Sequence, residues 1–190
     1  MKQNKFNQHY FFGKVYKNYD TFLNFGKLAR DLIKQYSFDS FLDIGCGCGN
    51  LVKEIKKQLE KKNKKQCNVQ GVDLSEYAVK RAGVPFVTLA DCKKLPFLNS
   101  SFELVYILAL FGYLETKKDI VRAMEEAYRV CSKQIVFEDV YNIPPASSDD
   151  YDPYRVHFLN RNEWHDLWLK VLKKDDRIEF NQEEIVITKK

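Results

Sequence analysis

Hydrophobic residues recur along the chain in two alternating patterns, short continuous runs and helically spaced positions. Apolar residues three or four positions apart predict helices over about 22–36, 51–59 and 120–127, and a short helix from Glu76. Ser75 is the expected cap of the short helix, and Thr116 forms a capping-box-like pair with Asp119 before the 120–127 helix. The short runs have the length of buried strands. They lie at Phe41–Ile44, Val69–Val72, Phe86–Leu89, Phe102–Ile107 and Gln134–Phe137. Strands that alternate with helices indicate a mostly parallel sheet covered on both faces.

The last fifty residues depart from this alternation. Residues 141–154 are rich in Pro, Ser, Asp and Tyr and predict a long loop, and a helix with an apolar side follows over about 164–172. Two runs at Arg177–Phe180 and Glu183–Thr188, with a tight turn at Asn181-Gln182, predict a closing hairpin. The predicted fold class is therefore α/β. It has a Rossmann-like, doubly wound, seven-stranded and mostly parallel sheet, with a C-terminal antiparallel hairpin.

Length and charge place few further limits on the protein. A chain of 190 residues without repeats or a linker predicts a single domain over 1–190. A domain of that size buries roughly 70% of its unfolded surface. The formal net charge of +5 permits an acidic partner without requiring one. We interpret the lysine run 61–65 as a solvated helix end on the edge opposite the expected ligand crevice, so nucleic acid is not favoured as a partner.

The N-terminal sequence and the cysteines indicate the cellular compartment of the protein. The first twenty residues lack a signal-peptide pattern, and no apolar run approaches the ~20 residues that span a bilayer, so no membrane partner is expected. The five cysteines are odd in number and have no framework spacing, which is typical of reduced thiols in a cytoplasmic protein. No Cys or His partners stand near Cys46 and Cys48 for zinc, and we expect no metal. The oligomeric state is left open.

Three glycines stand between the first strand and the next helix. Gly45, Gly47 and Gly49 permit positive φ and let a ligand approach the backbone closely. The following helix N-terminus offers free N–H groups and a partial positive charge. The dinucleotide fingerprint G-x-G-x-x-G would need glycine at position 50, where the chain has Asn50. A glycine triplet alone is equally compatible with a plain tight turn.

Three acidic residues strengthen the interpretation as a ligand site. Asp43 stands two residues before the first glycine, Asp73 ends the second strand, and Asp91 follows the third. Carboxyl ends of parallel strands meet at one edge of a sheet, where a carboxylate can accept both hydroxyls of a ribose. Asp91 could accept a hydrogen bond from an adenine amino group. The set of three in this order predicts a nucleoside-binding crevice.

Together these motifs resemble the class I S-adenosylmethionine (SAM)-dependent methyltransferases, and in particular the small methyltransferase-domain group called type 11. The resemblance covers about residues 12–140 and implies SAM as cofactor. The matching segments are Leu42–Gly49 for the glycine motif, Gly71–Ser75 for the second acid, Asp91–Phe97 with Ser100–Glu103 for the "Asp, Leu-Pro-Phe, Ser-Phe-acid" stretch, and Phe12, Tyr19 and Asp20 for the N-terminal element.

The resemblance assigns the methionine end of SAM to five residues. Gly45 and Gly47 would pass under the methionine part, with Cys46 between them in a variable slot of the turn. Asp43 would fix the turn and the amino group. Tyr19 would lie over the methionine end.

The resemblance assigns four others to the nucleoside end, and one more to the cofactor without specifying an end. Asp73 would hold the ribose, and Leu74 would pack on the adenine. Asp91 and Cys92 would meet the adenine edge. Ile107 would contact the cofactor from the fourth strand.

The methyl acceptor is not determined by these motifs. Many relatives carry histidines after the fourth strand, where this chain has Phe111–Leu114. His157 is our candidate general base for a hydroxyl acceptor, and a structural histidine beside Tyr154 and Arg155 is the alternative. Tyr113, Tyr151 and Tyr154 would line an acceptor pocket or only cap the core. We favour an oxygen or nitrogen atom of a small molecule. A protein or RNA acceptor, or a catalytically inert SAM-binding partner subunit, are the alternatives.

Two segments are expected to close over the site. Residues 1–36 predict an N-terminal helical lid segment. Residues 141–157 leave the fifth strand on the ligand side and predict a lid loop. A lid there would exclude water once the acceptor is bound.

Overall fold

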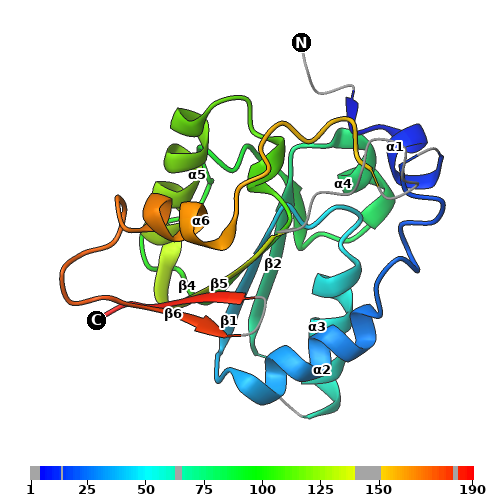
Figure 1. Ribbon diagram of the computed structural model, residues 1–190. Coiled ribbons are helices and arrows are strands. Elements are labelled where there is room, and N and C mark those ends of the chain that lie inside the picture. Colours follow the sequence, from blue (N-terminus) through cyan, green and yellow to red (C-terminus); the bar gives the residue numbers. More distant parts are fainter. Residues whose placement is uncertain (1–4, 14, 63–65, 140–150, 182–183) are drawn as a thin grey trace.

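The architecture is a seven-stranded sheet with helices on both faces, seen in a computed structural model that describes residues 5–13, 15–62, 66–139, 151–181 and 184–190 (Figure 1). The strand order is β3-β2-β1-β4-β5-β7-β6. Only β7 pairs antiparallel to its neighbours, β5 and β6, so the predicted fold class is confirmed. The strands are β1 (Ser40–Ile44), β2 (Asn68–Asp73), β3 (Val87–Leu89), β4 (Phe102–Leu108), β5 (Cys131–Glu138), β6 (Arg177–Asn181) and β7 (Glu184–Thr188).

Helices cover the two faces of the sheet in separate groups. The helices are α1 (Gln8–Phe12), α2 (Phe25–Gln35), α3 (Asn50–Lys61), α4 (Glu76–Ala82), α5 (Lys117–Val130) and α6 (Arg161–Trp168), with a 3₁₀ turn η2 (Phe111–Tyr113). Figure 1 shows α2 and α3 on one side of the sheet and α5 and α6 on the other. None of the described helices is long and apolar enough to cross a membrane.

Alternation along each strand divides the core into two layers. In β5, Ile135 and Phe137 pack toward α5 and α6, whereas Val136 packs toward α2 and α3. The same alternation recurs in β7, where Val186 pairs with Val136 in register. Trp164, on α6, is fully buried. Both faces of the central strands are therefore apolar, as the continuous runs in the sequence indicate.

Local capping explains where several helices begin. The Ser75 hydroxyl accepts from the Ala78 N–H at 3.0 Å at the start of α4. Thr116 accepts from the Asp119 N–H at 3.1 Å at the start of α5. Both caps were expected from the sequence and are confirmed; each satisfies a backbone donor that the helix leaves free.

Several element bounds differ from the sequence prediction. α2 begins at Phe25, not near residue 22, because the Asn24 side chain caps it by accepting from the Lys27 N–H at 2.9 Å. α6 ends at Trp168, so residues 169–172 follow it as a turn. β5 begins at Cys131, three residues earlier than predicted, because Cys131 already pairs with Phe102.

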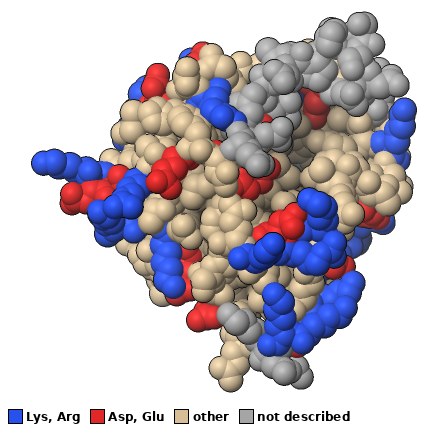
Figure 2. Space-filling view, turned by 60° about the horizontal axis from the view of Figure 1, so that its bottom comes forward, with Lys and Arg blue, Asp and Glu red and all other residues tan. Residues whose placement is uncertain are grey.

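The lower part of the molecule carries much of the positive charge. The lysine run begins at the C-terminal end of α3, and residues 63–65 lie outside the described part of the chain. Figure 2 shows Lys and Arg side chains spread over this face and interspersed with acidic ones. This arrangement is that of a solvated surface with mixed charge.

Candidate cofactor and acceptor site

The glycine turn joins β1 to α3 at the carboxyl edge of the sheet. Gly47 has φ +53°, and an added Cβ there would overlap the hydroxyl of Tyr19. The N–H groups of Gly45 and Cys46 donate to the Val72 carbonyl at 2.8 and 3.0 Å, which ties the turn to β2. The turn therefore places bare backbone beneath Tyr19, as a ligand cradle requires.

Asp73 is held at the end of β2 by backbone donors. One carboxylate oxygen accepts from the Gly47 N–H and the other from the Ser75 N–H, both at 2.8 Å. Burial raises the pKa of Asp73, although these hydrogen bonds oppose the shift. A carboxylate has about four acceptor sites, so each oxygen can still accept from a ligand hydroxyl.

An apolar area lies open beside Asp73. Leu74 follows Asp73 directly and is 39% exposed. Leu89, which pairs with Asp73 across β2 and β3, is 45% exposed. Asp91 lies just beyond Leu89 and Cys92 is nearly buried. Two open leucines next to acceptor groups suit a flat, partly apolar ring such as a nucleobase.

Asp43 lies in β1 immediately before the glycine turn and is 4% exposed. Burial, together with the nearby charge of Asp73, raises the pKa of Asp43 to about 8. Its carboxyl is therefore mostly protonated at neutral pH. A ligand cation at the turn would favour the ionised form and lower this pKa.

The N-terminal segment, described for residues 5–13 and 15–24, runs over this edge of the sheet. The Tyr19 ring packs edge-on against Phe11 and Tyr16, with centroids 4.8 and 5.1 Å apart. Burial holds the pKa of Tyr19 well above its usual value, so the hydroxyl stays protonated over Gly47. The structure thus brings Tyr19 to the glycine turn, where the resemblance had assigned it.

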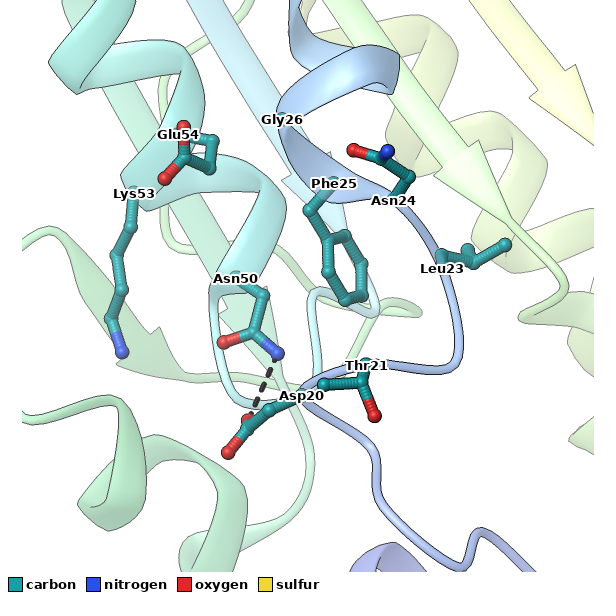
Figure 3. A pocket seen from close by; sticks show the side chains of 9 residues that line it. All are labelled: Asp20, Thr21, Leu23, Asn24, Phe25, Gly26, Asn50, Lys53 and Glu54. Atoms are coloured by element: carbon teal, nitrogen blue, oxygen red, sulfur yellow. Dashed lines mark hydrogen bonds between the residues drawn. The ribbon is translucent and has the colours of Figure 1, made fainter.

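Polar contacts fasten the segment beyond Tyr19. The Asp20 carboxylate accepts from Asn50 at 3.1 Å and pairs with Arg81 at 2.7 Å. An open hollow of about 550 Å³ lies beside these residues (Figure 3). It is lined by the beginnings of α2 and α3, and contains neither Asp43 nor Asp73. It is therefore separate from the predicted nucleoside-binding edge.

The end of β4 contributes contacts that the sequence analysis missed. Leu110 packs against Gly45, where an added Cβ would lie 3.0 Å from its side chain. Ala109 has φ +49°, a conformation that non-glycine residues rarely adopt, and its N–H donates to Glu138. Ile107, by contrast, is fully buried, with its side chain in the core toward α5 and α6. The sequence around Ala109 is a run of small and branched residues, and it gives no sign that Ala109 adopts a positive φ.

The 151–160 segment returns to the same edge (Figure 1). The His157 N–H donates to Gly112 at 2.9 Å, and its Nε2 is buried without a hydrogen-bond partner among the described residues. Arg155 and Asp139 form a buried ion pair beside it. Residues 141–150 of the predicted lid loop lie outside the described residues, as does Gln182 of the predicted turn.

Tyrosines from two segments meet at Asp152. The hydroxyls of Tyr10 and Tyr113 both donate to one carboxylate oxygen, at 3.0 and 2.7 Å. Tyr113 and Tyr154 had been candidates for an acceptor pocket. Tyr10 and Asp152 had not, because 142 positions separate them in sequence. Within the described residues, no three His, Cys, Asp or Glu side chains gather in a way that could hold a metal ion.

Comparison with known proteins finds a family model that matches the part of the chain containing the glycine turn. Residues 41–134 match a family model described as methyltransferase domain. No curated protein matches the chain. A SAM-dependent methyltransferase from Archaeoglobus fulgidus is 17% identical, with a TM-score of 0.69, over 96% of this chain and 100% of that one.

Two further solved structures share the fold. A Thermotoga maritima SAM-dependent methyltransferase, described as a possible histamine N-methyltransferase, is 18% identical with a TM-score of 0.64, over 96% of this chain and 100% of that one. The plantazolicin methyltransferase in complex with a pentazolic desmethylPZN analog and SAH is 18% identical with a TM-score of 0.68, over 95% and 93%. At these identities the likeness shows a common fold.

Proposed function

We propose that this chain, a SAM-dependent methyltransferase of the class I superfamily, transfers the methyl group of SAM to an oxygen or nitrogen atom of a small molecule. The observation that carries the proposal is the glycine turn, with Asp73 held beneath it and Leu74 left open beside it. The small-molecule acceptor is inferred from the N-terminal segment, which covers the edge where a macromolecule would have to approach.

The residues at this edge fit SAM. The position of Gly47 leaves no room for a side chain, and Asp73 retains acceptor capacity toward a ribose. Leu74 offers an apolar surface to adenine, with Asp91 and Cys92 at its edge. Asp43 lies where the cationic amino group of SAM would favour the ionised form of its carboxyl. SAM, when bound, supplies a methyl group activated by the sulfonium.

The chain's own contribution is to position the reactants and exclude water. Tyr19 covers the turn with a protonated hydroxyl, and the rings around it keep solvent away. Alignment of a nucleophile with the methyl group supplies much of the rate in such a displacement. His157 is the proposed base for a hydroxyl acceptor. Its buried Nε2 has to become accessible when the acceptor binds.

Calorimetry with SAM and S-adenosylhomocysteine (SAH) tests the cofactor assignment. Asp73→Ala should weaken both at least tenfold, since the ribose would lose a charged acceptor. Asp176→Ala is the matched control. Asp176 lies near β6, and its carboxylate accepts from the Tyr128 hydroxyl at 2.8 Å. This variant should bind SAM and SAH normally. Unchanged affinity in Asp73→Ala would remove the ribose role.

Tritium transfer from SAM tests the acceptor class. Label should enter the small-molecule fraction of a metabolite extract rather than its protein or RNA. Label in protein or RNA would reverse the proposal for the acceptor, and SAM binding without transfer to any fraction would favour an inert partner subunit. His157→Ala should slow transfer to a hydroxyl acceptor and leave SAM affinity unchanged.

A further inference from the structure

A single carboxylate gathers donors from three parts of the chain beside the cofactor edge. Asp152 accepts from the Tyr10 and Tyr113 hydroxyls on one oxygen and from the Tyr154 N–H, at 2.8 Å, on the other. Tyr10 belongs to α1, Tyr113 to the 3₁₀ turn after β4, and Tyr154 to the segment that follows Asp152. The carboxylate therefore joins the N-terminal segment to the body of the domain.

Aromatic rings enclose this carboxylate. Tyr16 packs edge-on against Tyr10 with centroids 5.3 Å apart, and its phenol lies close enough to those of Tyr10 and Tyr113 to raise their pKa values. Phe6 lies edge-on to Tyr113 at 5.7 Å, and Tyr154 lies edge-on to Tyr10 at 5.7 Å. Three phenol oxygens and one carboxylate thus face one another inside a shell of rings, which we call the Asp152 cluster.

The charge of the Asp152 cluster is negative. No described cation forms an ion pair with Asp152. Arg155, the cation nearest to it in sequence, is paired with Asp139, and its guanidinium lies 5.7 Å from the Tyr113 ring centroid. A negative charge next to several aromatic rings is an arrangement that attracts an organic cation.

The hydroxyl protons of Tyr10 and Tyr113 already form hydrogen bonds to Asp152. Burial, followed by neighbouring phenol and Asp152 charges, raises the pKa of Tyr10 and Tyr113 far above the ordinary value. Both hydroxyls therefore stay protonated and direct their protons to Asp152. What they offer a ligand is lone pairs, which together with the charge of Asp152 favour a positively charged group.

The Asp152 cluster is adjacent to the methionine end of the cofactor edge. Tyr16 contacts Tyr10 on one side and Tyr19 on the other, with centroids 5.3 and 5.1 Å apart. Tyr19 in turn lies directly on Gly47. Tyr16, a member of the Asp152 cluster, therefore contacts the residue that covers the glycine turn.

We propose that the Asp152 cluster is the acceptor subsite and that it recognises an amine in its cationic form. This inference rests on the proposed methyltransferase function and narrows its acceptor to a nitrogen. Because the cluster is packed, the amine reaches it when Tyr10 and Tyr16 move away from Tyr113 with the N-terminal segment. The bonds that Asp152 now accepts from Tyr10 are then replaced by bonds from the ammonium.

The reaction balances with these groups. The ammonium R–NH₃⁺ gives one proton to the Asp152 carboxylate and becomes R–NH₂. The nitrogen lone pair forms the N–CH₃ bond while the S–CH₃ bond breaks, and its electron pair stays on sulfur as SAH. The product leaves as R–NH₂⁺–CH₃, and Asp152 passes its proton to water.

Binding of a permanent cation tests the proposal without knowledge of the acceptor. The probe is choline, and its neutral isostere is 3,3-dimethylbutan-1-ol, both titrated calorimetrically into the protein with and without saturating SAH. We expect choline to bind at least tenfold more tightly than the isostere. Asp152→Asn should abolish that preference while SAH affinity stays unchanged.

Matched variants separate the Asp152 cluster from general effects. Asp176→Asn and Tyr128→Phe alter the other tyrosine–carboxylate pair and should keep the choline preference. Tyr113→Phe removes a phenol oxygen without removing a ring, and should weaken choline binding if Asp152→Asn proves unfolded by circular dichroism. Equal binding of choline and the isostere, a preference that survives in folded Asp152→Asn, or choline binding that is unchanged in Tyr113→Phe would overturn the amine subsite.

The outcome for SAH is independent of the outcome for choline. Failure of the wild-type protein to bind SAH would contradict the cofactor site and the function proposed above. Normal SAH binding without a preference for choline would contradict the amine subsite alone.

Discussion

Replacement of Asp43 by asparagine should make the stability of the protein much less dependent on pH. The Asp43 carboxyl is buried, and its pKa is raised to about 8 by burial and by the charge of Asp73. In the unfolded chain the same group ionises near pH 3.9. Between these values the unfolded state releases the proton and the folded state keeps it, so the free energy of unfolding falls as pH rises. This contribution is complete below about pH 4 and is lost by the time the pH passes 8.

The size of the effect follows from the two pKa values. One pKa unit corresponds to about 1.4 kcal/mol, so the interval of about four units amounts to at most roughly 6 kcal/mol. Asparagine resembles the protonated acid in shape and does not titrate. The stabilities of Asp43→Asn and wild type should therefore be similar at pH 4.5 and diverge by up to about 1.4 kcal/mol for each pH unit toward pH 8.

Urea unfolding at several pH values between 4.5 and 9 provides the assay. Trp164 and Trp168 are fully buried, so their fluorescence reports unfolding. Asp31→Asn is the control, because Asp31 is exposed and pairs only with Lys27 on the helix surface, and its curve should run parallel to wild type. Parallel curves for Asp43→Asn and wild type would refute the buried, protonated state of Asp43.

Three further predictions concern the site. SAM affinity should rise from pH 6 to pH 8 as Asp43 loses its proton and level off above, and calorimetry should find it nearly flat in Asp43→Asn; a flat wild-type profile would show that Asp43 does not sense the cofactor. Gly47→Val should abolish SAM binding because its side chain would fill the space between the turn and Tyr19, whereas Gly83→Ala, also at positive φ but with an added Cβ 3.7 Å from its nearest neighbour, should bind normally; equal binding by both would make the glycine turn merely structural. Ellman's reagent should react quickly with one thiol, that of half-exposed Cys67, since the other cysteines are buried; a fast phase that persists in Cys67→Ser would contradict this.

Most of the sheet and the cofactor edge could be predicted from local sequence signals. Continuous apolar runs located the parallel strands because those strands are buried on both faces. Ser75 and Thr116 marked helix starts through hydrogen bonds that span three residues. The glycines and Asp73 stand close together at the switch point of the sheet, so their spacing alone was informative.

Most of the contacts around Asp152 could not be predicted because they are long-range. α1 is five residues long and too short to be stable alone, and its Tyr10 is fixed by packing and by Asp152. Ala109 adopts a left-handed conformation that its neighbours impose. The start of α2 could not be predicted because several polar residues near it could have supplied the N-cap, which in the structure is Asn24. The roles of His157 and of the lid loop stay predictions.

The position of β7 between β5 and β6 also governs how the chain folds during synthesis. β7 pairs with β5, about 50 residues earlier in the chain. At ~5–20 residues per second, a ribosome needs roughly 3–10 s to make that stretch. During this interval the outer edge of β5, with the apolar run Ile135–Phe137, has no partner strand, and such an edge recruits other chains. We therefore expect chaperone supply and translation rate to set the yield of folded protein.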